Sequence, residues 1–261
     1  MPIGVFEMYK IVYILFLLYS FVECGKSTFI SLYPSPMIVG GYQAPHEFGL
    51  FHVSLQNLTG HHVCGGAVVS VQDLVTAAHC VIDAEPQYIV VVIGTTNLNV
   101  RGKRYNVDSI SIHDKYNTTI RQNDIAVLRI RGTFDLESIR ILDLSEEKLQ
   151  EGDPVSLSGY GASEPYGFTK LQLYYLNATV FSQEVCRFAM RYSREVTDRM
   201  FCTFTKIGQG TCHGDSGGPL TKGNKLVGVV SWGIPCAVGF PDVHTRISPY
   251  VAWIRKQIEK K

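Results

Sequence analysis

The fold of this chain is constrained most by a series of short segments in which apolar and polar residues alternate. In the first of them, Phe51, Val53 and Leu55 fall on one face of an extended chain. Clusters of Gly, Pro, Asn and Asp separate these segments, which are residues 51–55, 90–93, 107–112, 125–130, 155–157, 171–181 and 226–231. Many short strands at this spacing are typical of β-barrels and β-sandwiches, so the sequence predicts an all-β fold.

One strong helical pattern lies at the C-terminus. Ser248 can cap this helix, and Pro249 fits its first position. Val251, Ile254 and Ile258 then lie on one helix face. The sequence therefore predicts a C-terminal α-helix that docks on a β-rich body.

Composition excludes two broad classes of protein. Hydrophobic residues make up 46% of the 261 residues and the net charge is +1, whereas disordered chains combine low hydrophobicity with high net charge. Lys and Arg number 24 against 23 Asp and Glu, so the chain lacks the basic excess of a general nucleic-acid binder. A chain of this length can bury a sizeable core, as one large domain or two small ones.

The N-terminus carries a short apolar run at residues 11–22. Crossing a bilayer takes about 20 residues, so a secretory signal is favoured over the alternative, a membrane anchor. We predict a signal peptide at residues 1–24, a propeptide at 25–37 and a mature domain at 38–261. The mature protein is then extracellular and free of the membrane.

Cysteines of a secreted protein usually form disulfides. Cys24 falls in the signal, which leaves six cysteines in an oxidising compartment and predicts three disulfides whose pairing the spacing leaves open. No Cys-x-x-Cys pair is present in the sequence, which disfavours a zinc site. Three sequons permit glycosylation, at Asn57, Asn117 and Asn177.

Three motifs carry side chains suited to catalysis. Ser216 lies among glycines in residues 214–218, where backbone N–H groups can converge on one oxygen. His79 stands beside a cysteine, and Asp124 precedes an apolar strand. Taken alone, each has an ordinary explanation: a glycine-rich turn, a structural histidine and a turn residue. Together they supply a nucleophile, a base and a carboxylate that can orient the base.

These motifs, in the order His, Asp, Ser, resemble those of the chymotrypsin-like serine peptidases. Residues 38–41 (Ile-Val-Gly-Gly) resemble the mature N-terminus of that family, and residues 231–233 (Ser-Trp-Gly) resemble its substrate-binding strand. The resemblance runs from residue 38 to the C-terminus. It implies two six-stranded antiparallel Greek-key barrels with a C-terminal α-helix and an active site in the cleft between the barrels.

The resemblance assigns a role to each site residue. Ser216 attacks the peptide carbonyl, His79 takes the serine proton, and Asp124 holds the imidazole in the right tautomer. The N–H groups of Gly214 and Ser216 form the oxyanion hole. The substrate pairs as an extra strand along Ser231, Trp232 and Gly233. The implied disulfides are Cys64–Cys80, Cys186–Cys202 and Cys212–Cys236.

The resemblance also implies activation by cleavage. The freed amino group of Ile38 pairs with the Asp215 carboxylate and orders the oxyanion loop, so the precursor is inactive. Residue 37 is Met, where the family usually has Arg or Lys. A trypsin-like activator should not cut there, so either an enzyme that accepts Met cuts the chain or it is processed differently.

Specificity is expected to depend on two positions of the substrate pocket. Gly210 takes the floor position where Asp gives preference for Arg and Lys, which favours an apolar pocket. Asp242 aligns with a second floor position that is usually Gly, and this combination resembles arthropod chymotrypsins and collagenolytic serine peptidases. We expect cleavage after large apolar residues, with basic side activity from Asp242. The alternative is that Asp242 points away and only narrows the pocket.

Two other functions stay open on the sequence. Residues 214–218 also fit the nucleophile elbow of α/β-hydrolases, in which Asp242 and His244 would complete the triad. A non-catalytic secreted homologue is the other alternative, although all three catalytic residue types are present. We expect no cofactor and no metal, because residues 94–98 lack acidic calcium ligands. The expected partners are protein or peptide substrates and serine protease inhibitors, and we expect a monomer.

Overall fold

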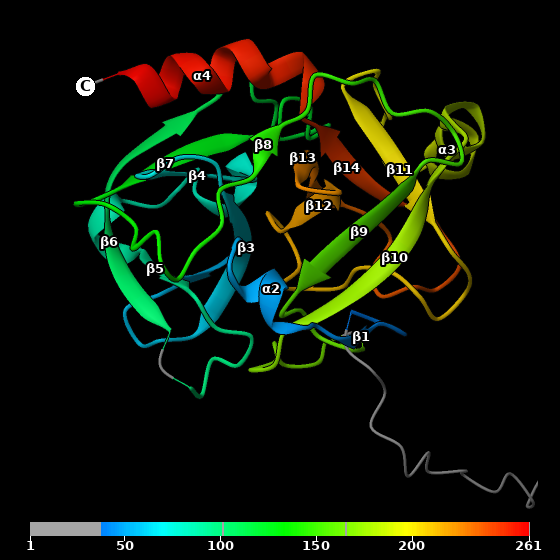
Figure 1. The fold of residues 1–261 in the computed structure, drawn as a ribbon. Helices are drawn as coiled ribbons and strands as arrows, with labels where there is room; N and C mark the ends of the chain where they lie inside the picture. Colours follow the sequence, from blue (N-terminus) through cyan, green and yellow to red (C-terminus); the bar gives the residue numbers. More distant parts are fainter. Residues whose placement is uncertain (1–37, 101, 165, 261) are drawn as a thin grey trace, which may run out of the picture. The chain divides into compact units, whose positions relative to one another are not determined.

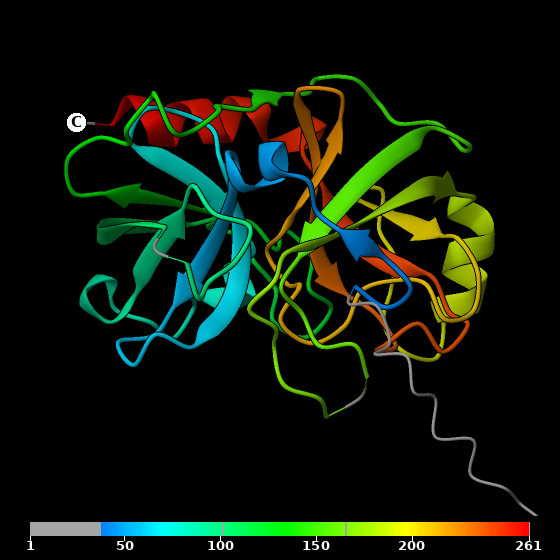
Figure 2. The same cartoon turned by 60° about the horizontal axis from the view of Figure 1, so that its bottom comes forward.

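A computed structural model describes residues 38–100, 102–164 and 166–260 (Figure 1). The predicted signal peptide and propeptide, residues 1–24 and 25–37, lie outside the described residues. Two β-barrels lie side by side in the described part, as both ribbon views show (Figures 1 and 2). Within that part, no helix is long and apolar enough to cross a membrane.

The first barrel closes in the strand order β2-β3-β4-β7-β6-β5, with antiparallel neighbours throughout. Its core holds Val53, Leu74, Val91 and Leu128, all fully buried. Apolar side chains at alternate positions point inward, and this packing closes the sheet on itself. The strands are β2 (His52–Gln56), β3 (His62–Val68), β4 (Asp73–Thr76), β5 (Val90–Ile93), β6 (Lys103–Ile112) and β7 (Ala126–Ile130).

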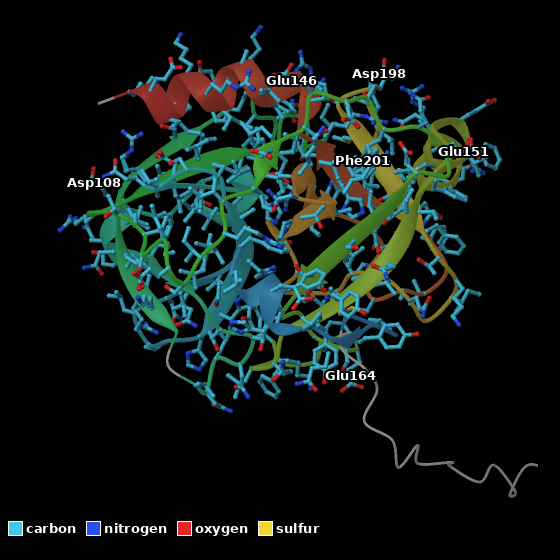
Figure 3. All side chains as sticks on the ribbon, viewed as in Figure 1. Asp108, Glu146, Glu151, Glu164, Asp198 and Phe201 are labelled. Carbon is cyan, nitrogen blue, oxygen red and sulfur yellow. A yellow bond between two sulfur atoms is a disulfide. The ribbon has the colours of Figure 1, made fainter. Side chains whose placement is uncertain are left out.

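The second barrel closes in the order β9-β10-β11-β14-β13-β12, because β12 pairs back with β9. Phe201 lies inside it, whereas Asp108, Glu151 and Asp198 lie at the periphery of the molecule (Figure 3). Its strands are β9 (Pro154–Gly159), β10 (Tyr174–Phe181), β11 (Met200–Phe204), β12 (Pro219–Lys222), β13 (Lys225–Trp232) and β14 (Asp242–Arg246). Two short strands extend it: β1 (Tyr42–Gln43) beside β10, and β8 (Asp143–Leu144) parallel to β13.

The predicted all-β architecture is therefore confirmed, and one prediction about the C-terminal helix needs correction. The C-terminal helix α4 (Val251–Glu259) is present, but Ser248 does not cap it. The Tyr250 N–H donates to the Ile247 carbonyl at 2.8 Å, so the chain enters α4 through the 3₁₀ turn η4 (Ser248–Tyr250) that contains Ser248. Val251 and Ile254 are buried against the body as predicted.

The sequence pattern missed the helix α3 (Gln183–Met190). Ser182 caps it by accepting a hydrogen bond from the Val185 N–H, and Cys186 and Met190 point into the core four residues apart. The remaining short elements are α2 (His46–Gly49) and the 3₁₀ turns η2 (Ala78–Cys80) and η3 (Pro86–Tyr88).

Candidate active site

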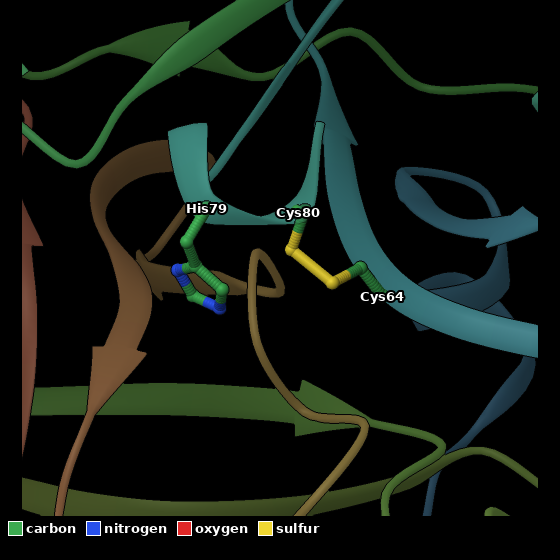
Figure 4. Close-up of side chains that lie close together, drawn as sticks. All are labelled: Cys64, His79 and Cys80. Atoms are coloured by element: carbon green, nitrogen blue, oxygen red, sulfur yellow. A yellow bond between two sulfur atoms is a disulfide. The ribbon is translucent and has the colours of Figure 1, made fainter. Parts of the chain in front are cut away.

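His79 lies on the η2 turn, directly before the disulfide that joins Cys80 to Cys64. Figure 4 shows the imidazole ring beside this disulfide, which ties the turn to strand β3. The side chain of His79 is 15% exposed, so the ring is held by its surroundings and still reaches the surface. Cys64, His79 and Cys80 have metal-like spacing, but both sulfur atoms are already bonded to each other.

Asp124 is fully buried and receives hydrogen bonds from three donors. Its Oδ1 accepts from the His79 backbone N–H at 2.9 Å. Its Oδ2 lies 2.7 Å from His79 Nδ1 and accepts from the Ser231 hydroxyl at 2.5 Å. A carboxylate so placed keeps the proton of a neutral His79 on Nδ1 and leaves Nε2 free to accept.

Residues of the second barrel hold the Asp124 loop in place. The Thr245 hydroxyl on β14 donates to the Asp124 carbonyl at 2.9 Å. The Tyr250 hydroxyl donates to Asn123 Oδ1 at 2.8 Å, and Asn123 Nδ2 donates to the Lys115 carbonyl at 2.6 Å. Sequence reasoning missed the bonds from Thr245 and Tyr250, because each joins residues more than 100 positions apart, and it also missed the local bond from Asn123 to Lys115.

Ser216 sits on a loop that both barrels anchor. Its carbonyl accepts from the Gly65 N–H of β3 at 2.7 Å, and the Gly217 N–H donates to the Val230 carbonyl of β13 at 2.8 Å. Gly217 has φ +77°, and a Cβ there would collide with Thr76 and the Gly65 backbone. Only glycine therefore fits after the serine.

The backbone beside Ser216 offers two amide hydrogens. Within the described residues, neither the Gly214 nor the Ser216 N–H donates to a protein acceptor. The Gly214 carbonyl, in contrast, bonds to Nε2 of the buried His62 at 2.9 Å. That bond fixes the orientation of the peptide at Gly214 and leaves the amide groups available for a ligand oxygen.

One cavity of about 160 Å³ brings most of the predicted site residues together. Arg121, which the sequence analysis did not single out, also lines it and lies three positions before Asp124. The predicted residues in its wall are His79, Ser216, Ser231, Trp232, Gly233 and Asp242. His79 and Ser216 share this cavity without a hydrogen bond between them, a looseness common in substrate-free sites.

Asp242 lines the cavity and is 6% exposed. Its Oδ2 accepts from the Thr211 N–H at 2.7 Å, and a Cβ on Gly210 would fall 2.6 Å from the same oxygen. The carboxyl of Asp242 thus occupies the space that a side chain at position 210 would need. Burial raises the pKa of Asp242 to about 7, and the hydrogen bond from Thr211 opposes that shift.

Asp215 is fully buried between the backbones of Gly159 and Gly161, where a Cβ on either glycine would collide with its carboxyl. The N–H groups of Gly161 and Cys212 each donate to it at 2.8 Å. No cation pairs with it among the described residues, and burial raises its pKa to about 7. A cation beside this buried carboxyl would stabilise its ionised form.

Ile38 begins the described chain with its side chain fully buried in the core of the second barrel. The next residue, Val39, pairs with Gly210, whose N–H donates to the Val39 carbonyl at 3.0 Å. The N-terminal segment therefore packs against the loop that precedes the cavity. The pairing of the Ile38 amino group with Asp215 stays a prediction.

The three disulfides join the cysteine pairs that the resemblance implies: Cys64–Cys80, Cys186–Cys202 and Cys212–Cys236. The third closes the loop that carries Ser216. Closing loops of this size contributes about 3 kcal/mol each in the chain-entropy account. The three sequon residues Asn57, Asn117 and Asn177 are exposed, and their glycosylation stays a prediction.

Three buried histidines lie outside the lining of the cavity. His52 Nδ1 bonds to the Ser158 hydroxyl, His62 Nδ1 to the Ser54 hydroxyl and His244 Nε2 to the Thr203 hydroxyl, each at 2.8 Å. Burial lowers the pKa of His52 and His244 to about 3 and that of His62 to about 4. All three are therefore neutral in the folded protein.

These groups predict weaker folding in acid. Between pH 6.5 and about 4 the unfolded chain binds three more protons at these histidines, so stability falls as pH falls. Asp215 and Asp242 act oppositely, because their folded pKa of about 7 lets the folded state hold two extra protons. Summed over these five groups, the unfolded chain binds about one proton more than the folded chain. The free energy of unfolding therefore falls by about 1.4 kcal/mol for each unit by which pH is lowered. We expect urea unfolding of the Ser216→Ala chain to show this slope between pH 6 and 5, and His52→Gln to flatten it. An unchanged slope in His52→Gln contradicts the assignment.

Comparison with known proteins places the chain in a family. The family model for trypsin matches residues 38–254. Chymotrypsin-2 of Vespa crabro is 35% identical over 221 residues, which cover 84% of this chain and 99% of that protein. Hypodermin-B of Hypoderma lineatum is 35% identical over 221 residues, covering 83% and 86%. Trypsin epsilon of Drosophila erecta is 34% identical over 223 residues, covering 84% and 86%.

The family match spans both barrels, the cavity and the loop of Ser216. The α/β-hydrolase alternative is wrong, because Ser216 sits between antiparallel barrels and His244 is buried against Thr203. The non-catalytic alternative is set aside by the match together with the residues gathered in the cavity. The chain belongs to the trypsin family and is a serine endopeptidase.

Proposed function

We propose that Ser216, His79 and Asp124 hydrolyse peptide bonds through an acyl-enzyme. Ser216 Oγ attacks the carbonyl carbon while His79 Nε2 takes its proton, and the protonated ring then gives that proton to the leaving amine. A water molecule then attacks the acyl-enzyme while His79 takes its proton. The protonated ring gives that proton to Ser216 Oγ, and the acyl group leaves as a carboxylic acid. The observation that carries this proposal is the hydrogen-bonded His79–Asp124 pair in the same cavity as Ser216.

The amide hydrogens of Gly214 and Ser216 are suited to the oxyanion. Because no protein acceptor within the described chain takes them, they can donate to the oxygen that becomes negative in the tetrahedral intermediate. Losing one donor of this kind costs about 3–4 kcal/mol of transition-state stabilisation. Substrate backbone would pair along residues 231–233, which places the scissile carbonyl at these amides.

For specificity we propose a pocket that takes large apolar residues and also Arg or Lys. The relatives include proteins named chymotrypsin and trypsin at 34–35% identity, so the support comes from the pocket. Val230, Trp232 and Pro235 offer apolar walls. Asp242 at its end is neutral or ionised near pH 7, so it can tolerate an apolar side chain or pair with a cationic one.

We further propose that the chain is secreted as an inactive precursor and acts as a monomer that serine protease inhibitors can block. Three disulfides support an oxidising compartment. Asp215 is buried and has no cationic partner among the described residues, which supports activation by cleavage, because a new amino group at Ile38 would supply that cation. The pKa of Asp215 should fall when that pair forms.

The test uses Met37→Arg, which makes the junction a substrate for immobilised trypsin. We expect the uncut chain to resist diisopropyl fluorophosphate. The cut chain, freed of the trypsin, should be labelled at Ser216 and hydrolyse peptides. Adding Asp215→Asn to the cut chain should lower kcat/KM by about 10²–10⁴-fold, because removing one partner of a buried pair costs about 3–5 kcal/mol.

The outcomes separate the two parts of the proposal. Labelling of the cut chain at any residue other than Ser216, or no labelling, contradicts the catalytic assignment. Equal labelling before and after cleavage contradicts activation, while leaving Ser216 as the nucleophile. Peptide mass spectrometry of the labelled chain gives the position.

A further inference from the structure

Arg121 brings a positive charge into the wall of the catalytic cavity. Its Nη1 lies 4.0 Å from Asp124 Oδ2, too far for a hydrogen bond. The same carboxylate oxygen already has partners in His79 and Ser231. Asp124 therefore does not satisfy the Arg121 guanidinium.

The Nη1 group of Arg121 is buried and has no hydrogen-bond partner within the described residues. An unpaired buried donor costs free energy, and the Arg121 side chain, which is 24% exposed, recovers that cost when it turns this group to a ligand acceptor. The guanidinium also lies close to the Tyr116 hydroxyl. Burial and the Asp124 carboxylate raise the pKa of Tyr116, whereas the charge and hydrogen bond of Arg121 and the charge of Arg194 lower it. The two arginines thus act on the same part of the surface.

A second cavity is also lined by basic residues. It has a volume of about 650 Å³, and Gln122, the neighbour of Arg121 in the sequence, lines it. Four arginines line it together with only two acidic residues, Glu195 and Asp198. Asp198 is already paired with Arg187 at 2.6 Å. The four arginines are Arg187, Arg191, Arg194 and Arg199.

Trp232 connects the two cavities. It lines the catalytic cavity, and the Arg194 guanidinium lies 5.7 Å from the centre of its ring. Within the described chain, Arg194 takes part in none of the ion pairs. A peptide that runs along residues 231–233 therefore passes between Arg194 and Arg121, whose one ion pair among the described residues is the 4.0 Å contact with Asp124.

We propose that this enzyme selects substrates with Asp or Glu at P2, the residue before the one that enters the pocket (P1). The inference rests on the proposed function and names the substrate class of the same site. Successive side chains of an extended peptide point to opposite sides. When P1 enters the pocket beside Asp242, P2 therefore points the other way, and we infer that it meets His79 and Arg121, which line the same cavity.

The chemistry of Arg121 fits a carboxylate. A guanidinium presents parallel N–H donors that match two carboxylate oxygens, and such charge-assisted bonds are the stronger kind. Arg194 adds attraction for acidic residues earlier in the substrate. We expect kcat/KM to be about 10- to 100-fold higher for Asp than for Asn at P2, with an advantage that shrinks as salt is added.

The test compares peptides that share Phe at P1 and differ only at P2, as Asp, Asn, Ala or Arg. The Asp-to-Asn ratio of kcat/KM is measured within one enzyme, so a general loss of activity in a variant cancels. Arg121→Gln should bring the ratio to about one, and Arg121→Lys should restore part of it. Arg255→Gln is the matched control, because Arg255 lies on helix α4 and pairs with Glu146, and its ratio should equal that of the unchanged enzyme.

An Asp-to-Asn ratio of one or less in the unchanged enzyme overturns the inference, as does a high ratio that survives in Arg121→Gln. In either case cleavage of the Asn and Ala peptides leaves the proposed function standing. Failure to cleave every peptide, with no labelling of Ser216, overturns the proposed function and this inference with it. The ratio in the unchanged enzyme decides the question even where a variant does not fold.

Discussion

Changing Ser216 to alanine is expected to lower kcat by on the order of 10⁶-fold, and Asp124→Asn by on the order of 10⁴-fold. The double variant should be no slower than Ser216→Ala. Without the hydroxyl there is no acyl-enzyme, so orienting the base no longer helps. What remains is the contribution of the two amide donors and of substrate binding.

Asp124→Asn should act through the tautomer of His79. The carboxylate now accepts from the His79 backbone N–H through Oδ1 and from the ring Nδ1 through Oδ2. An asparagine that keeps the first bond turns its NH₂ group toward the ring. The ring must then accept at Nδ1 and carry its proton on Nε2, where it cannot take the proton of Ser216.

The measurement is single-turnover kinetics on the cut chain, with KM followed separately. KM should change little, because Asp124 is fully buried and does not touch substrate. Thr245→Val is the control: it removes one hydrogen bond to the Asp124 carbonyl, worth about 1 kcal/mol, and should cost about tenfold or less. Additive losses in the double variant would contradict a unit built from these three residues.

The sequence located this unit better than it located its supports. Gly217 could be anticipated, because a serine that exposes its hydroxyl and its N–H needs a tight turn. Thr245 could not, because its bond to Asp124 joins residues 121 positions apart and depends on how the barrels pack. Arg121 was overlooked for a similar reason: only the fold turns its side chain into the cavity rather than to solvent.

The sequence likewise predicted some strands and missed others. Strands with one solvated face, such as β10, alternate and were predicted. β3 and β14 were missed because polar residues and glycines interrupt their apolar pattern, as at Gly65, Gly66, Asp242 and His244. β2, which is also buried at every position, was predicted because its apolar residues alternate. The Ser248 cap failed because a local signal cannot report the 3₁₀ turn through which the chain reaches α4.

The second large effect is expected at Asp242. Asp242→Gly should lower kcat/KM for Arg substrates by about 10²–10⁴-fold, because leaving the cationic side chain without its buried partner costs about 3–5 kcal/mol. Phe substrates should be affected far less, since they need no charge at the end of the pocket. A series of peptides with Phe, Leu, Lys or Arg at P1 measures both changes in one preparation.

Gly210 supplies the matched control. A Cβ at position 210 would lie 2.6 Å from Asp242 Oδ2, so a carboxylate at one position excludes a carboxylate at the other. Gly210→Asp alone should therefore damage the pocket, whereas Gly210→Asp combined with Asp242→Gly should recover cleavage after Arg. Recovery in the double variant shows that the charge matters and not merely the shape of residue 242.

The pH dependence of the unchanged enzyme gives an independent measure of the same carboxyl. Its pKa of about 7 means that it is mostly protonated at pH 6 and mostly ionised at pH 8. An Arg side chain needs the ionised form, so the ratio of kcat/KM for Arg over Phe substrates should rise with pH and level off above about 8. The ratio cancels the titration of the catalytic base, which acts on both substrates. A ratio that is flat from pH 6 to 8, or one that still rises in Asp242→Gly, would show that another group governs cleavage after Arg.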